Sequence, residues 1–152
     1  MPVTYRPDDG AGPEKSSVVV LRWSRHPRCV GLARRELRKA LGGWGLSGIE
    51  DPAVLVLSEL LTDAVRNGDV RPSAEIETRY LRLRNGLRIE VSDTVHESRQ
   101  STACSLEPDR DPRLRLVDAL ADRWKMNGSF GLVTSAWAEL DFPPQAGDPD
   151  VG

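Results

Sequence analysis

Cysteine, histidine and lysine are scarce in this sequence, and each shortage limits what the chain can do. The two cysteines, Cys29 and Cys104, lack the spacing of a metal or redox motif, so we expect reduced thiols. The two histidines, His26 and His96, have no acidic or thiol partner at ligand spacing. We therefore expect neither a zinc site nor a nucleophilic triad. Only three lysines occur, so arginine supplies nearly all of the positive charge.

Long apolar runs and a strong charge bias are also missing. No segment has the length and apolar character of a transmembrane helix, and no signal-peptide pattern is present. The formal net charge of −2 gives no overall basic field for direct nucleic-acid binding. Hydrophobic residues make up 39% and charged residues 29% of the 152 residues, which is typical of one globular domain with a polar surface. We expect a cytoplasmic protein that contacts neither membranes nor nucleic acid.

Proline, glycine and acidic residues are concentrated at both ends of the chain. Residues 1–15 are expected to form a disordered arm, and residues 143–152 a disordered tail. Apolar residues with helix or strand periodicity occupy the stretch between them. One folded domain is therefore expected over residues 16–142.

The first three elements of this domain are predicted from β-branched residues and helix-end signals. Residues 17–23 are a β-branched run and predict a strand. A helix is predicted from Pro27, with apolar residues at helical spacing and an end at the two glycines 42–43. A second helix is predicted to open at residues 51–52 (Asp-Pro) and to close at residues 67–68 (Asn-Gly), which suit a left-handed cap.

A hairpin follows the second helix. Asn85 and Gly86 form a strong turn signal between two alternating segments, residues 74–84 and 87–92. The apolar phase of the first segment shifts near residues 80–81, which predicts a bulge or a half-exposed start at that point. The two segments are therefore expected to form neighbouring antiparallel strands.

The rest of the domain alternates an irregular stretch with short elements. Residues 94–113 lack periodicity and are expected to form a loop that is either functional or disordered. A short helix at 114–121 and a last strand at 135–140 follow. This order of elements predicts an α+β fold, a two-layer sandwich in which three helices cover one face of a mixed, mostly antiparallel sheet of about five strands.

The predicted second helix has three polar residues on one side. Glu59, Asp63 and Asn67 follow one another at intervals of four, so two carboxylates and an amide lie on one helix side. The opposite stripe, within residues 54–65, is apolar and must face a core. A magnesium–nucleotide site needs such oxygen atoms, whereas a solvated acidic face has the same pattern. Both interpretations are open at this point.

Six segments together resemble the GHKL ATPase superfamily, and specifically the small anti-sigma-factor serine/threonine kinases. They follow the family's order and span most of residues 17–141. The resemblance implies the Bergerat, or histidine kinase-like ATPase, fold with a site for ATP and Mg²⁺. The matching segments are residues 31–35, 44–46, 54–68, 87–93, 116–124 and 137–140.

The resemblance also implies roles for individual residues. Glu59 matches a glutamate that resembles a general base for the attacking hydroxyl. Asp63 stands where the family has a magnesium-ligating asparagine, and aspartate is itself a hard oxygen ligand. Asn67 replaces the family's histidine and can still form a hydrogen bond. Asp93 matches the aspartate that accepts a hydrogen bond from adenine. Ser135 aligns with a threonine that helps fix that carboxylate or its bridging water.

The phosphate-binding glycines of the family are missing. Val95 stands where relatives have a glycine after the adenine aspartate, and residues 111–114 (Asp-Pro-Arg-Leu) replace a Gly-x-Gly-Leu segment. Such glycines let backbone amides approach phosphate. Pro112 has no amide to donate, and Arg113 in a left-handed conformation would cost about 1–2 kcal/mol. Guanidinium groups could instead bind the phosphates, and they are available on Arg110, Arg113 and Arg115.

Two functions follow from this resemblance. The first is an ATP-binding regulator that sequesters a sigma factor and phosphorylates a serine of an anti-sigma-factor antagonist protein. The second is a degenerate pseudo-kinase that keeps partner binding but has weak or no ATP binding, as the lost glycines favour. A structural adaptor without a regulatory partner is a third interpretation. The resemblance also makes a homodimer an open expectation.

Two further groups of residues have simpler interpretations. The basic cluster at residues 34–35 and 38–39 is interpreted as a solvated helix face, although an acidic partner surface could dock there. The tryptophans are interpreted as core or edge packing rather than as a stacking platform; they are Trp23, Trp44, Trp124 and Trp137.

Overall fold

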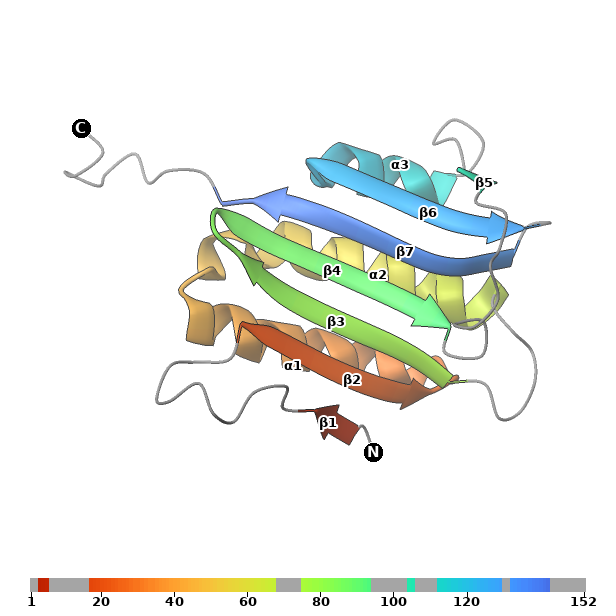
Figure 1. Ribbon diagram of the computed structural model, residues 1–152, viewed down its shortest axis with the longest axis horizontal. Coiled ribbons are helices and arrows are strands. Elements are labelled where there is room, and N and C mark those ends of the chain that lie inside the picture. The colour runs from red at the N-terminus through yellow and green to blue at the C-terminus, as the bar shows by residue number, and fades with distance from the viewer. Residues whose placement is uncertain are drawn as a thin grey trace.

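An antiparallel sheet with three helices on one face forms the described part of the chain (Figure 1). The computed structural model describes residues 3–5, 17–67, 75–93, 104–105, 112–129 and 132–142. For some of these residues it describes the backbone and not the side chain, namely 3–5, 67, 104–105, 112–114, 128–129 and 132–134. The elements are β1 (Val3–Tyr5), β2 (Val18–Ser24), α1 (Arg28–Trp44), η2 (Ser47–Ile49), α2 (Glu50–Asn67), β3 (Glu75–Leu83), β4 (Gly86–Asp93), β5 (Cys104–Ser105), α3 (Pro112–Leu120), β6 (Arg123–Ser129) and β7 (Leu132–Asp141).

The sheet has five long strands with one short strand at each edge. Its order is β1-β2-β3-β4-β7-β6-β5, and every described pair of neighbouring strands is antiparallel. The predicted α+β two-layer sandwich is thus confirmed. Strand β1 lies inside the arm 1–15 for which the sequence predicts disorder, so at these three positions the structure has a strand instead. The rest of that arm, and the tail 143–152, lie outside the described residues.

The hairpin β3–β4 forms at the predicted turn without the predicted bulge. Its register runs without interruption from Ile76 opposite Asp93 to Leu83 opposite Gly86. The apolar phase shift has a different cause, because Leu81 and Leu83 are half-buried on the sheet face that lies away from the helices. A register irregularity lies elsewhere, between β6 and β7 at residues 127–128.

Helix α1 begins where the sequence predicts and ends later. Pro27 is its N-cap, and the His26 Nδ1 atom accepts a hydrogen bond of 3.0 Å from the Arg28 amide. The two glycines 42–43 do not end the helix, which was a wrong prediction. The chain continues helically to Trp44, whose side chain is buried in the core, and stops at Gly45 with φ 74°. A left-handed glycine at this position closes a helix without steric cost.

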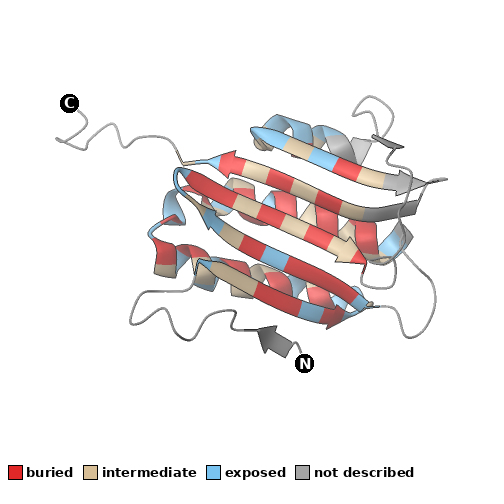
Figure 2. Cartoon of the chain, in the orientation of Figure 1, coloured by how far each residue is buried: buried red, intermediate tan, exposed pale blue. Residues whose placement is uncertain are grey.

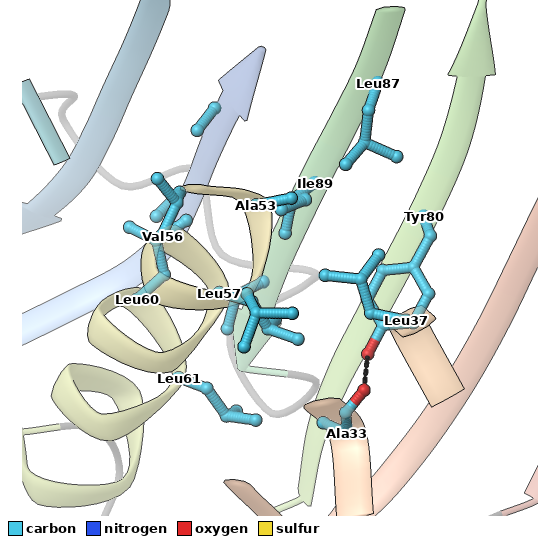
Figure 3. Packing of buried hydrophobic residues seen from close by; sticks show 14 of the residues in the cluster. Ala33, Leu37, Ala53, Val56, Leu57, Leu60, Leu61, Tyr80, Leu87 and Ile89 are labelled. Carbon is cyan, nitrogen blue, oxygen red and sulfur yellow. Dashed lines mark hydrogen bonds between the residues drawn. The ribbon is translucent and has the colours of Figure 1, made fainter. Parts of the chain in front are cut away.

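The core lies between the helices and the facing side of the sheet. Along β4 and β7, alternate residues are buried against the helices, as the alternating colours in Figure 2 show. Helix α2 contributes a dense apolar stripe, within which Leu57, Leu60 and Leu61 are nearly inaccessible to solvent (Figure 3). Helix α1 is fixed to the sheet by a buried hydrogen bond of 2.8 Å from the Tyr80 hydroxyl to the Ala33 carbonyl.

Polar groups that enter this core are matched with partners. The Trp23 indole donates a 2.9 Å hydrogen bond to the Thr78 hydroxyl. Burial raises the pKa of the Tyr80 phenol, so this side chain stays neutral while it donates to helix α1. Trp44 is buried as well, and Trp124 packs at the edge of the core while donating to Asp118. The core or edge interpretation is thus confirmed for these three tryptophans.

Candidate functional site

The two sides of helix α2 face different neighbours. Ser58 lies on the side next to α1, because its hydroxyl accepts a hydrogen bond of 3.4 Å from Arg34 Nη1. Val56, Leu60 and Asp63 lie on the opposite side and are all buried. That side packs against α3 and β7. Of the polar line predicted on this helix, Asp63 therefore lies on the buried side of α2 that is opposite Ser58.

The three residues of this line have different exposures. Each step of four residues turns about 40° around a helix axis, so such a line cannot stay parallel to the axis. Glu59 is half-buried, whereas one step later Asp63 is only 4% exposed. Asn67 is the last residue of α2, and its side chain lies outside the described residues. A solvated acidic face does not account for the burial of Asp63.

Asp93 is the second buried carboxylate on this side of the sheet. It ends β4, where Leu87, Ile89 and Val91 point into the core, and it continues that alternation with 6% exposure. In Figure 1 the end of β4 and the C-terminal end of α2 lie toward the same side of the molecule. Asp63 and Asp93 therefore enter the same half of the interior from two different elements.

Among the described residues, only one other carboxylate is buried to this degree. Glu77 accepts hydrogen bonds from Arg22 and Arg79, which neutralise its charge on the opposite face of the sheet. Burying a carboxylate costs free energy unless hydrogen bonds or opposite charges compensate it. Ion pairing in the sheet accompanies the burial of Glu77, which lies on the face away from the helices, whereas Asp63 and Asp93 are the buried carboxylates among the described residues on the helix side.

Ser135 does not lie with Asp93, contrary to the sequence-based expectation. Ser135 pairs with Ser92 across β4 and β7, at positions that point away from the helices. Its hydroxyl accepts a hydrogen bond of 3.3 Å from Asn127 Nδ2, and it lines a shallow hollow on the outer face with Ser92 and Trp137. Neighbouring strand positions point to opposite faces, so Asp93 and Ser135 are separated by the sheet.

The strand alternation of β7 was the signal that could have prevented this misplacement. Ala136, Ala138 and Leu140 are the buried positions, so the odd-numbered positions between them point outward. Thr134 precedes Ser135 in β7, and in the β6–β7 register it has no paired residue in β6. Its side chain lies outside the described residues.

From Pro112 onward, the chain is helical where the GHKL proteins that it resembles have a glycine segment. Helix α3 begins at Pro112, and a proline suits the first turn because its missing amide has no intrahelical partner there. Arg113 is therefore in a right-handed helix, and the expected cost of a left-handed arginine does not arise. The side chains of residues 112–114 lie outside the described residues, as do Val95 and Arg110. Arg115 is exposed.

The described residues contain no preassembled metal cage. No group of three or more histidine, cysteine, aspartate and glutamate side chains in that part of the chain gathers closely enough to hold an ion. Mg²⁺ commonly binds proteins through one or two carboxylates and takes its other ligands from phosphate and water. Asp63 fits that role as a single hard ligand, and it would need a nucleotide to complete the coordination.

The outer face of the sheet is occupied by a network of ion pairs. Glu139 accepts hydrogen bonds of 2.8 Å from Arg123 Nε and 2.7 Å from Arg88 Nη1, and these lower the pKa of its carboxyl group. Arg88 also pairs with Glu90 at 2.7 Å, and its guanidinium lies 4.2 Å from the centre of the Trp137 ring. The charged groups named here are thus paired with one another on the outer face of the sheet.

No family model and no curated protein matches this sequence. None of the described helices has the length and apolar character needed to cross a membrane. Function must therefore be inferred from the arrangement of the residues themselves.

Proposed function

We propose that the protein is an ATP-binding regulator of the anti-sigma-factor serine/threonine kinase type. In this proposal it acts in the cytoplasm and controls transcription by binding a sigma factor, an anti-sigma-factor antagonist protein, or both. The supporting fold is an antiparallel sheet with three helices on one face, in the element order that the resemblance implies. The proposal concerns the interior side of the sheet, because the outer face carries its own ion pairs.

The burial of Asp63 and Asp93 is the observation that carries this proposal. Both carboxylates lie on the helix side of the sheet, one on α2 and one at the end of β4. A buried carboxylate can accept a hydrogen bond from the adenine amino group, which is the role proposed for Asp93. A second carboxylate near the phosphates would supply one ligand to Mg²⁺, which is the role proposed for Asp63.

Glu59 is the proposed general base of a phosphoryl transfer. Its side chain is half-buried one helical turn before Asp63, so a substrate side chain could reach it from solvent. The serine hydroxyl of a partner would lose its proton to Glu59 while its oxygen bonds to the γ-phosphorus of ATP. The bond between that phosphorus and the β–γ bridging oxygen breaks, and ADP leaves.

A degenerate pseudo-kinase is the second candidate function. The observation that favours it is the start of α3, where Pro112 and Arg113 are helical at the place of the glycines in relatives. Each lost backbone donor to phosphate would cost about 1–3 kcal/mol of binding free energy. Two such losses would weaken a micromolar site toward millimolar affinity. Partner binding would be unaffected by this change.

Thermal unfolding with and without Mg-ATP tests the proposal. A ligand at about 5 mM with a dissociation constant of about 0.1 mM stabilises the native state by about 2 kcal/mol. The unfolding midpoint of the natural protein should then rise by about 5 °C. Asp93→Asn should lose this rise, whereas Asp51→Asn, an exposed carboxylate at the start of α2, should keep it. An unchanged midpoint of the natural protein would contradict ATP binding and leave the pseudo-kinase and the structural adaptor.

A further inference from the structure

A hollow on the outer face of the sheet lies apart from the proposed nucleotide site. It lies between β4 and β7, which run side by side in front of the helices in Figure 1, and it has a volume of about 220 Å³. Two cross-strand pairs line it, Glu90 with Trp137 and Ser92 with Ser135. Trp137 is the tryptophan that does not pack in the core, so core packing does not explain its position.

The shape of the hollow follows from the sizes of its residues. The two serines form its low part because their side chains are short, and Glu90 and Trp137 form a wall beside them. Val91 and Ala136 also line the hollow; since their side chains are buried toward the helices, their backbone atoms form its floor. Pockets for drug-sized ligands measure about 300–1,000 Å³. This hollow is smaller and suits a molecule of the size of one substituted six-membered ring.

The polar side chains of the hollow can form further hydrogen bonds. Ser135 accepts a hydrogen bond of 3.3 Å from Asn127 Nδ2, and the proton of its own hydroxyl remains available. The Ser92 hydroxyl forms no hydrogen bond with another described residue. Glu90 accepts a hydrogen bond from Arg88 at Oε2 and has a second carboxylate oxygen. A ligand whose groups both donate and accept, as hydroxyls do, would match these three side chains.

The charges around the hollow favour a neutral ligand. Glu90 is the charged residue of the lining, and Arg88 pairs with it at 2.7 Å. An anion in the hollow would be repelled by this carboxylate. A cation would be repelled by Arg88, whose guanidinium already lies 4.2 Å from the centre of the Trp137 ring. It would also approach Lys125, an exposed residue on the neighbouring strand β6. A neutral ligand avoids both repulsions.

We propose that this hollow binds a neutral, hydroxyl-rich ring, namely one pyranose unit of a sugar. The ring of Trp137 would cover the apolar C–H groups of the pyranose. The hydroxyls of Ser92 and Ser135 and the carboxylate of Glu90 would form hydrogen bonds with its hydroxyl groups. A free monosaccharide and the end of a longer saccharide share this chemistry. The inference does not rest on the proposed kinase, because the hollow and the proposed nucleotide site lie on opposite faces of the sheet.

A titration of the isotope-labelled protein, followed by its amide and indole chemical shifts, tests the proposal. The probe is methyl α-D-glucopyranoside, added to well above the dissociation constant of about 1–10 mM that the size of the ligand predicts. The largest shifts are expected at Ser92, Ser135 and the indole of Trp137. Butylammonium chloride and sodium acetate serve as charged probes, and each should bind about tenfold more weakly than the glucoside.

Two serine variants form a matched pair for this titration. Ser92→Ala and Ser24→Ala each remove one hydroxyl from the outer face of the sheet, but Ser24 lies at the exposed end of β2, away from the hollow. Ser92→Ala should weaken binding of the glucoside about three- to tenfold, and Ser24→Ala should leave it unchanged. Trp137→Leu should abolish detectable binding while thermal unfolding shows that the variant is folded.

Maltotriose, added in place of the glucoside, distinguishes the two sources of the sugar ring. Tighter binding than that of the single ring supports the end of a longer saccharide, and equal or weaker binding supports a free sugar. The proposal would be overturned by shifts absent from the hollow, by equal weakening in Ser92→Ala and Ser24→Ala, or by tighter binding of either charged probe. The effect of Mg-ATP on the unfolding midpoint is a separate measurement, so either proposal can fail without the other.

Discussion

Asp63 combines a position that argues for a ligand with a charge that argues against one. It is buried on α2, on the helix side of the sheet, where Asp93 is buried as well. Next to a triphosphate it would add repulsion, and Mg²⁺ would convert that repulsion into attraction. The residue therefore predicts a nucleotide site whose affinity depends more strongly on metal than a site with a neutral amide at this position.

Substitution of Asp63 tests whether the affinity for ATP depends on the metal in this way. Asp63→Asn keeps the shape of the side chain and removes its charge, so ATP without metal should bind about threefold tighter or better, as a modest electrostatic gain predicts. The affinity for Mg-ATP should change less, because the lost metal ligand offsets the reduced repulsion. Titrations in excess magnesium and in excess chelator give both affinities. Equal effects of the substitution under the two conditions would place Asp63 away from the phosphates.

The C-terminal end of helix α1 was predicted less well from the sequence than the helix itself. The pair of glycines 42–43 predicted a helix end. The helix instead continues through them to Trp44, whose side chain is buried in the core, and it is capped by Gly45. Local sequence signals do not contain this information, because the extra turn is stabilised by contacts with the distant core.

Two alanine substitutions distinguish the glycine that ends α1 from one that lies within it. Gly45→Ala should destabilise the protein by about 1 kcal/mol, because an alanine at φ 74° meets its own backbone. Gly42→Ala should stabilise it by up to about 1 kcal/mol, because a Cβ there meets only open space and favours the helix. Urea denaturation measures both changes in the free energy of unfolding. Equal destabilisation by the two substitutions would contradict the observed helix end.

The ion pairs across β4, β6 and β7 predict an acid-dependent stability. Hydrogen bonds from Arg123 and Arg88 lower the pKa of Glu139 in the folded state. The resulting stability is present above the ordinary pKa of a glutamate and is lost as pH falls through the lowered folded value. Glu139→Gln should cost about 1 kcal/mol near neutral pH. Its free energy of unfolding should then fall less than that of the natural protein below about pH 4. Parallel curves for the two proteins would contradict this.

At the scale of the whole molecule, the order of helices and strands was largely predictable from the sequence. The face of the sheet on which some side chains lie was not. Turn signals such as Asn85 and Gly86 and the periodicity of α2 are local, so they predicted the hairpin and the second helix correctly. Ser135 was expected beside Asp93 because it aligns with the threonine of the GHKL family. The alternation of buried residues along β7 places its side chain on the outer face instead. Helix α2, which carries the buried Asp63, packs against α3 from a distant part of the chain, and local patterns do not predict such packing.

The division of the sheet into two chemically different faces is the central feature of this molecule. Ion pairs, including those of the buried Glu77, and the hollow beside Ser135 lie on the outer face, and the buried carboxylates Asp63 and Asp93 lie on the side of the helices. The proposed nucleotide site belongs to the inner side alone. Substitutions on the two faces should therefore have unequal effects on nucleotide binding, even where the residues are close along the sheet.

Calorimetric titration of Mg-ATP into the natural protein, Asp93→Asn and Ser135→Ala tests this claim most directly. The natural protein should bind with a sub-millimolar dissociation constant. Asp93→Asn exchanges the charged acceptor of the proposed adenine hydrogen bond for a neutral amide with one acceptor oxygen, and it should weaken binding about tenfold or more. Ser135→Ala, on the opposite face, should bind as the natural protein does. No heat from the natural protein at millimolar Mg-ATP, or a larger loss in Ser135→Ala than in Asp93→Asn, would contradict a nucleotide site on the inner side of the sheet.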